Sequence, residues 1–276
     1  MTPAAERAPW IFSPRARCAG LALSLLCVAV TSEARDCGDS VGGVRVPCAC
    51  GDAVVSDTVL DPHDPVVSGR CPIDGLTVRA HDHAETITLD LDGLALVGSG
   101  SGIGIQVEKG GSEGAAIIGG SDGRRGEIVG FNVGVAVRKA EAVRRIQGLV
   151  LKGNRRNGLE LRTAGTIVVG VRAERNGSDG VRVTGRGGRL LDIESVENGE
   201  AGVRAFGFDL IVEARAFDNG RHGIVTGGYR SDLRRSVSMR NRGYGVLVAG
   251  TGHRVDGVVT DANAQGQLGH RNGGAR

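Results

Sequence analysis

Charged side chains recur along this chain at a nearly constant step of 22 residues. One row, which we take as the candidate polysaccharide-facing row, holds an acid and two bases: Glu160, Arg182 and Arg204. Two further rows also mix charge with glycine or apolar residues: Gly170, Asp192, Glu213, Arg235 and Gly257, then Arg172, Glu194, Arg215, Val237 and Val259. An acid one step from an arginine can form a structural ion pair, or the charged groups can take part in acid–base chemistry on a polysaccharide. For most of these residues we expect a solvated, charge-paired face.

The rows follow from a repeat. Asparagines recur in the order Asn154, Asn176, Asn198, Asn219, Asn241 and Asn263. Four residues after each of the first five stands a glycine, in the order Gly158, Gly180, Gly202, Gly223 and Gly245, and each glycine precedes a short alternating segment. A second strand pattern precedes each asparagine. Because two strands cannot bury an apolar face alone, this period predicts coils that stack in parallel, about 4.8 Å apart.

The asparagine column has two interpretations. Asparagine tolerates the left-handed backbone conformation at a sharp corner, and its amide can bond to equivalent amides along a stack. We therefore expect a ladder, the alternative being solvated turn residues. Asn132, 22 residues before Asn154, is a further candidate member, although its glycine follows after two residues instead of four. We expect Phe217, in register with Val196 and Met239, to lie in the core.

Composition limits the class of protein. The 276 residues include 47 glycines without a collagen period, and a fixed repeat argues against low complexity. The net charge is only +3 and no basic block is present, which argues against a nucleic-acid partner. No proline follows Pro72, as continuous strand ladders require. No segment has the sustained period of an amphipathic helix.

Residues 1–34 have the pattern of a secretory signal peptide: Arg15 and Arg17 precede an apolar run too short to span a bilayer, and small residues follow at a cleavage site. Leu26 before Cys27 argues against lipid attachment. Export predicts a secreted or periplasmic protein without a transmembrane segment in the mature chain. It also predicts two disulfides among Cys37, Cys48, Cys50 and Cys71. Cys48 and Cys50 are too close to pair, so one bonds Cys37 and the other Cys71. A metal site at Cys48 and Cys50 is the weaker alternative.

The chain therefore divides into a signal peptide (1–34), a cysteine-rich N-terminal cap (35–75), a parallel β-helix of eight or nine coils (76–268) and a polar C-terminal tail (269–276). The expected fold is all-β, a single-stranded parallel β-helix with coils of about 22 residues and a disulfide-tied cap. We expect the tail to be frayed.

The glycine, the alternating triplet, the polar turn, the second strand and the Asn-Gly step resemble the coils of the pectate-lyase-like superfamily. The cysteine-rich front resembles the leader of exported bacterial β-helix proteins. The resemblance covers residues 76–268 and implies a right-handed parallel β-helix. It implies no single activity, because the superfamily includes lyases, hydrolases, epimerases, tail-spike proteins and non-catalytic members.

Two short motifs contain residue types that could serve catalysis or metal binding in such a fold. Asp61-Pro62-His63-Asp64 matches an active-site motif of β-helix alginate epimerases and lyases, but here it lies in the cap and lacks their Tyr-Gly lead. His81 and His83 could form a metal pair, but no further ligand is near in sequence, and a solvated loop is the better interpretation. No coil supplies an acidic trio beside an arginine. We therefore predict no metal and no cofactor, with Ca²⁺ needed only by a lyase.

The sequence thus favours an exported β-helix protein of the cell envelope or extracellular space, without catalytic activity, that binds extended polysaccharide. A polysaccharide lyase or uronate epimerase is the first alternative, and a structural or adhesive surface protein is the second. Neither the ligand nor the oligomeric state follows from the sequence.

Overall fold

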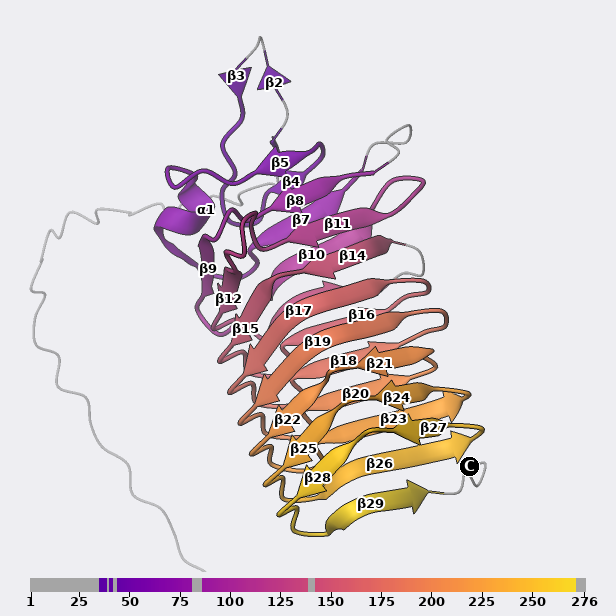
Figure 1. Cartoon of the computed structure of the whole chain (residues 1–276). Helices are drawn as coiled ribbons and strands as arrows, with labels where there is room; N and C mark the ends of the chain where they lie inside the picture. Colours follow the sequence, from indigo (N-terminus) through magenta and orange to yellow (C-terminus); the bar gives the residue numbers. More distant parts are fainter. Residues whose placement is uncertain (1–34, 39, 42–43, 81–85, 139–141, 272–276) are drawn as a thin grey trace, which may run out of the picture. The chain divides into compact units, whose positions relative to one another are not determined.

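The computed structural model describes residues 35–38, 40–41, 44–80, 86–138 and 142–271, all within one compact unit, Glu33–Arg276. The predicted signal peptide and the His81–His83 segment lie outside the described residues. Within them, the one helix is the four-residue α1 (Pro65–Ser68), and every other regular element is a β-strand (Figure 1). No helix in the described part of the chain is long and apolar enough to cross a membrane.

The described strands form two large parallel sheets that run the length of the stack. The first, called sheet 1 here, has eleven strands in chain order: β1 (Asp36–Cys37), β4 (Ala53–Val54), β7 (Leu76–Arg79), β10 (Ile103–Lys109), β13 (Val133–Val137), β16 (Leu159–Arg162), β18 (Val181–Thr184), β20 (Val203–Phe206), β23 (Ile224–Tyr229), β26 (Tyr244–Thr251) and β29 (Gly266–Arg271).

Sheet 2 has sixteen strands in two parallel runs that share β17 (Ile167–Glu174) and β19 (Arg189–Val196). The first run adds β5 (Thr58–Val59), β8 (Thr88–Asp90), β11 (Ala115–Ile118), β14 (Val143–Gln147), β21 (Leu210–Val212), β24 (Asp232–Arg234) and β27 (Arg254–Asp256). The second adds β6 (Arg70–Cys71), β9 (Ala95–Gly98), β12 (Gly126–Val129), β15 (Leu149–Lys152), β22 (Arg215–Phe217), β25 (Val237–Met239) and β28 (Val259–Asp261). A separate antiparallel hairpin joins β2 (Ser40–Val41) to β3 (Val44–Arg45).

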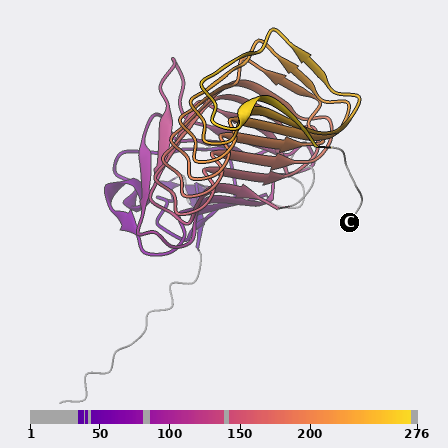
Figure 2. The ribbon, with the colours of Figure 1, turned by 90° about the horizontal axis from the view of Figure 1, so that it is seen from below.

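The stack follows from the sequence period. Leu159 pairs with Val181, which pairs with Val203, so residues one repeat apart lie on neighbouring strands. These three side chains are fully buried, and the residues that alternate with them face outward. Successive coils therefore lie one behind another around a continuous apolar core (Figure 2). The chain is a parallel β-helix, as the sequence predicted.

Left-handed residues bend each coil, and their position corrects the sequence analysis. The asparagines do not adopt the left-handed conformation. The residue before each one does, with φ between +51° and +60°: Gly153, Arg175, Glu197, Asp218, Arg240 and Ala262. The row of Gly170, Asp192, Glu213, Arg235 and Gly257 is also left-handed, so it forms the bend between the two runs of sheet 2; in β17 and β19 this bend lies inside the strand.

The six asparagines form a continuous buried ladder. Each Oδ1 from Asn176 to Asn263 accepts hydrogen bonds from both the backbone N–H and the Nδ2 of the preceding asparagine, at 2.9–3.1 Å. Asn132 does not belong to it: the backbone N–H of Phe131 donates to Asn154 Oδ1 at 3.0 Å, and the Phe131 ring is buried. The ladder therefore gives hydrogen-bond partners to the buried backbone N–H groups and side-chain amides at this corner of each coil.

The N-terminal cap is continuous with the stack. Disulfides join Cys37 to Cys48 and Cys50 to Cys71, which confirms two bridges and none between Cys48 and Cys50. The stack has more coils than the eight or nine expected, because β1 and β4 of the cap already pair within sheet 1. At the other end, β29 continues to Arg271, past the predicted boundary at 268, because its pairing with β26 extends to Ala249↔Arg271.

Candidate functional site

Glu160, Arg182 and Arg204 lie side by side on the outward face of sheet 1, on β16, β18 and β20. The polar groups of Arg204 and Glu160 are engaged within the protein. The Arg204 guanidinium donates to both carboxylate oxygens of Asp179, at 2.8 and 3.0 Å, and this hydrogen bond raises the pKa of Arg204 above its ordinary value. Glu160 accepts from Asn157 Nδ2 at 2.9 Å, and Arg182 lies 3.9 Å from Asp179. Arg204 and Glu160 therefore serve internal contacts.

A second column of side-chain acceptors lies beside this row, three residues after the ladder asparagines. Asn157 Oδ1 accepts the backbone N–H of Asp179, Asp179 Oδ1 accepts that of Ala201, and His222 Nδ1 accepts that of Tyr244, at 3.0–3.1 Å. The sequence analysis missed this column because its members differ in type. Their common spacing from Asn154, Asn176 and Asn219 was the available signal.

His222 is the member of this column whose acceptor is an imidazole nitrogen. Its ring is buried and stacks on Tyr244, with 5.8 Å between the ring centroids. Burial, and then the charges of Arg221 and Arg204, lower the pKa of His222 below its ordinary value. Since Nδ1 accepts a hydrogen bond, the neutral ring carries its proton on Nε2. The histidine thus holds a coil corner as a neutral group.

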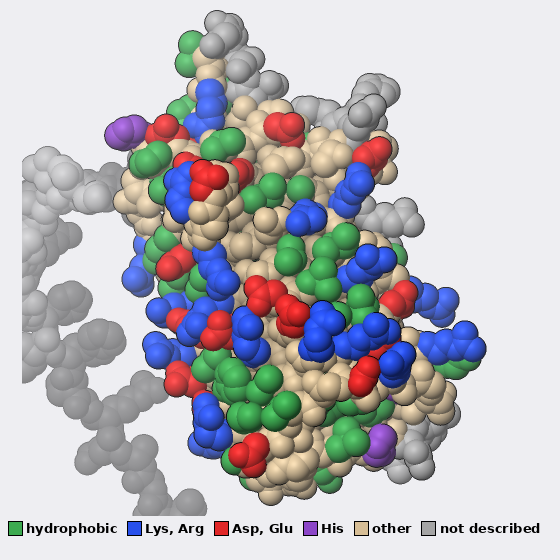
Figure 3. Space-filling view, viewed as in Figure 1, with side chains coloured by type: hydrophobic (Ala, Val, Ile, Leu, Met, Phe, Trp, Pro, Cys, Tyr) green, Lys and Arg blue, Asp and Glu red, His purple; other side chains and the backbone are tan. Residues whose placement is uncertain are grey.

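The outward face of sheet 2 is largely charge-paired, as expected for a solvated face (Figure 3). Arg172 bonds Glu174 and Glu194, both at 2.7 Å, and Arg235 lies 3.1 Å from Glu213. Burial raises the pKa of Glu174, but hydrogen bonds from Arg172 and Lys152 outweigh it and the net shift is downward. Such pairs leave little free charge for a ligand.

An apolar stripe interrupts this face. Val196, Phe217 and Met239 lie in register on β19, β22 and β25 and point outward, half-buried. The prediction that Phe217 lies in the core was wrong, because the inward positions next to it hold Ser195, Ala216 and Ser238. The Arg240 guanidinium lies 5.6 Å from the centre of the Phe217 ring.

The Asp61-Pro62-His63-Asp64 motif is structural in this chain. Asp64 is 1% exposed; its carboxylate accepts two hydrogen bonds from Arg45, at 2.8 and 2.7 Å, and further bonds from the backbone N–H groups of Cys48 and Asp61. Its oxygens are therefore occupied in joining the hairpin to the cap. Among the described residues, no group of three or more His, Cys, Asp and Glu is placed to hold a metal ion.

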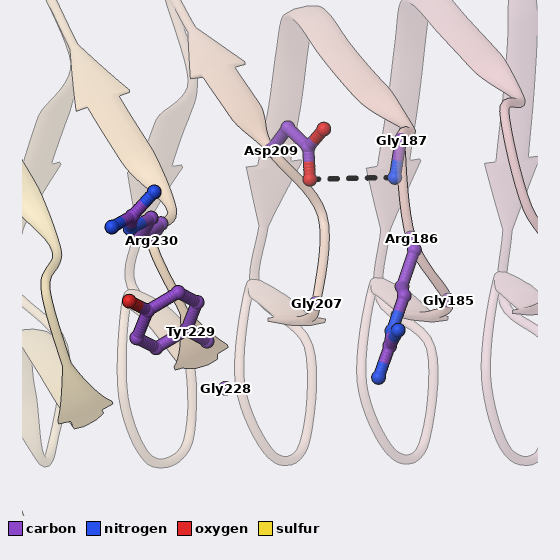
Figure 4. A pocket seen from close by; sticks show the side chains of 8 residues that line it. All are labelled: Gly185, Arg186, Gly187, Gly207, Asp209, Gly228, Tyr229 and Arg230. Atoms are coloured by element: carbon purple, nitrogen blue, oxygen red, sulfur yellow. Dashed lines mark hydrogen bonds between the residues drawn. The ribbon is translucent and has the colours of Figure 1, made fainter.

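A groove lies where the strands of sheet 1 end and three successive coils turn toward sheet 2. It has a volume of about 800 Å³ and is lined by Gly185, Arg186, Gly187, Gly207, Asp209, Gly228, Tyr229 and Arg230 (Figure 4). Gly185, Gly207 and Gly228 form its floor, so the backbone is bare there. A side chain at Gly207 would collide with the Gly185 carbonyl, and its φ of +76° also requires glycine.

Side chains rise on both sides of this floor. Tyr229 and Arg186 come from the outer two coils and flank the middle coil, which contributes Gly207 between them (Figure 4). Tyr229 is 64% exposed, and the Arg230 guanidinium lies 4.9 Å from the centre of its ring. Asp209 accepts from the backbone N–H of Gly187 at 3.3 Å, and its other oxygen has no hydrogen-bond partner among the described residues. The groove thus combines an aromatic face with hydrogen-bond donors and one acceptor.

No family model matches the chain, and no curated protein matches it. Among solved structures, it is similar to full-length tailspike protein 2 of the Escherichia coli O157:H7 bacteriophage CAB120, with 11% identity and a TM-score of 0.44, over 79% of this chain and 37% of that chain.

It is also similar to a mutant of the periplasmic alginate epimerase AlgG, with 14% identity and a TM-score of 0.42, over 74% of this chain and 68% of that chain. The match to the tailspike covers 37% of that protein, so this chain spans well under half of the tailspike's length. By its own strand register and its disulfides, the chain is a parallel β-helix protein with a disulfide-tied N-terminal end.

Proposed function

We propose that the protein binds an extended polysaccharide in the groove between Arg186 and Tyr229, without cleaving it. The observation that carries the proposal is the arrangement of an exposed tyrosine ring above a bare glycine floor, with charged groups at the rim. The apolar face of a sugar ring stacks on an aromatic ring, and sugar hydroxyls bond guanidinium and carboxylate groups.

The dimensions of the groove suit a polymer. Its walls stand two coils apart, which corresponds to about 9.6 Å at the strand spacing of about 4.8 Å. The candidate row of Glu160, Arg182 and Arg204 is the weaker site, because Arg204 and Glu160 already have internal partners.

The same lining favours binding over catalysis. Hydrolysis of a glycosidic bond generally needs two carboxyl groups, and the lining residues include one, Asp209. A lyase or epimerase needs a base placed beside a bound sugar, and the candidates among the lining residues are Asp209, Tyr229 and the two arginines, so this alternative is tested by product analysis. We propose no cofactor, so binding should persist in a chelator.

The two disulfides support an oxidising compartment, either the periplasm or the extracellular space. This location is where cell-envelope polysaccharide is found, and it is part of the proposal. An adhesive role with a protein partner is the remaining alternative.

The test is a glycan array followed by calorimetry on the polysaccharides that bind. We expect Tyr229→Ala to weaken binding about tenfold, or about 1.4 kcal/mol, and Tyr229→Phe to retain it because the ring is kept. Ile73→Ala, at an equally exposed apolar side chain in the cap, is the matched control. When the protein is incubated with a polysaccharide that binds, neither new reducing ends from hydrolysis nor unsaturated products from a lyase reaction should accumulate. Absence of binding to every glycan, or full binding by Tyr229→Ala, would overturn the proposal.

A further inference from the structure

The two ends of the coil stack differ in how well they close the core. At the N-terminal end, Cys37, Cys48 and Cys71 are completely buried within the cap. In the last described coil, Val255 and Leu268 are 38% and 49% exposed. Both occupy inward positions, since they pair with Leu233 and Val246, which are fully buried. The apolar core is therefore open at the C-terminal end of the described residues.

The backbone is open at the same end. Among the described residues, β27, β28 and β29 each pair with one strand only, namely β24, β25 and β26 (Figure 1). Terminal strands with free backbone groups and exposed apolar side chains are templates for pairing with another chain, and repeat stacks usually cover them.

We propose that this end pairs with the same end of a second copy of the chain, about a two-fold axis. A second copy fits because, among the described residues, the apolar core is uncovered at one end only, although β1, β5 and β6 at the other end also pair on one side only. Pairing of the open end with the disulfide-tied end would extend into a filament, whereas pairing of two open ends closes after two copies. The surface is separate from the polysaccharide groove and does not depend on it.

The charges on β27 fit this symmetry. The strand reads Arg254, Val255, Asp256, and all three residues are exposed; within one copy the Arg254 guanidinium lies 3.1 Å from the Asp256 carboxylate, so pairing with a second copy would extend this ion pair into a four-charge cluster. In an antiparallel pair centred on Val255, the two valines meet, and each Arg254 lies opposite the Asp256 of the other copy. Within one chain, β27 pairs with β24 in parallel. Opposite charges are neighbours there as well, because Asp232 lies beside Arg254 and Arg234 lies beside Asp256.

The test uses light scattering on the full chain and on two charge reversals, Arg254→Asp and Asp256→Arg. We expect a dimer for the unchanged protein. Each reversal places like charges opposite each other and should yield a monomer, whereas an equimolar mixture of the two variants should restore a dimer containing one copy of each. Since the mixture restores complementary pairs, its recovery also shows that both variants are folded.

The matched controls are Arg125→Asp and Glu127→Arg, which are two residues apart around the start of β12. That strand pairs on both sides, with β9 and β15, so these exposed charges lie away from an end. They should leave the dimer intact. A monomeric unchanged protein, reversals that remain dimeric, or a mixture that stays monomeric would each overturn the proposal.

Discussion

The side-chain amide of Asn198 occupies the space that a side chain on Gly180 would need. A Cβ built on Gly180 would lie 2.7 Å from Asn198 Nδ2. The same contact recurs at Gly134, Gly158, Gly202, Gly223 and Gly245, each facing the ladder asparagine of the adjoining coil at 2.5–3.0 Å. None of these glycines has a positive φ. The glycine column therefore serves the ladder by leaving room for its amides.

Gly180→Ala should destabilise the protein by about 1–3 kcal/mol, the usual cost of forcing extra atoms into a packed interior. The added methyl would displace the Asn198 amide and also meet the Ser195 hydroxyl. Urea unfolding measures the change. Gly69→Ala is the control, because Gly69 has a φ of −142° and open space around it, so it should be neutral. Equal stability of the two variants would contradict this explanation.

Asn198→Ala should be strongly destabilising. It leaves the N–H and Nδ2 of Asn176 without their Oδ1 acceptor, and each buried unsatisfied group costs on the order of 1–3 kcal/mol. Asn263→Ala should cost less, because Asn263 is the last member of the ladder and is 7% exposed. The comparison requires urea midpoints for both. An Asn198→Ala protein as stable as the parent would mean that the ladder contributes nothing.

Arg204→Ala should destabilise by about 3 kcal/mol, since it strands the carboxylate of Asp179, which is 3% exposed. Arg182→Ala should change stability by less than about 0.5 kcal/mol, because that guanidinium is about half exposed and 3.9 Å from the same carboxylate. Thermal unfolding of the two variants shows whether the row of Glu160, Arg182 and Arg204 has a structural role or faces a ligand. Similar small effects would favour the ligand-facing interpretation.

Removal of the Cys50–Cys71 bridge should lower stability by about 3 kcal/mol, the chain-entropy value for a loop near its 21-residue separation. Removal of Cys37–Cys48, with a separation of 11, should cost somewhat less. Paired Cys→Ala variants and urea unfolding provide the measurement, and mass mapping of the non-reduced protein checks the pairing. Free thiols at these four positions would refute the oxidised cap.

Asp64 should make the cap acid-sensitive. Burial raises its pKa, but hydrogen bonds from Arg45 and from the N–H groups of Asp61 and Cys48 outweigh burial, so the pKa falls below its ordinary value of 3.8. A carboxyl whose folded pKa is depressed contributes stability above the unfolded pKa, and that contribution is lost as pH falls through the folded pKa.

Between pH 5 and pH 2, Asp64→Asn should therefore lose less stability than the parent, measured as urea midpoints. Asp122→Asn, at an exposed carboxyl, should follow the parent curve. A parent-like slope for Asp64→Asn would show that another group is responsible.

The sequence by itself determined the stack. In parallel strands, residues one period apart become neighbours, so a 22-residue step in Asn176, Asn198 and the following glycines already specifies which side chains meet. The cysteine spacing likewise excluded a Cys48–Cys50 bridge, although it left the partners of Cys48 and Cys50 open.

Only the tertiary structure decided the bends and the candidate site. The period does not say which residue of a turn takes the left-handed conformation, and this proved to be Glu197 and its equivalents, before each asparagine. The groove depends on three coils together: Arg186 and Tyr229 form walls only because Gly207, on the coil between them, has no side chain. Such a site arises from differences between repeats, whereas sequence analysis by period detects what the repeats share.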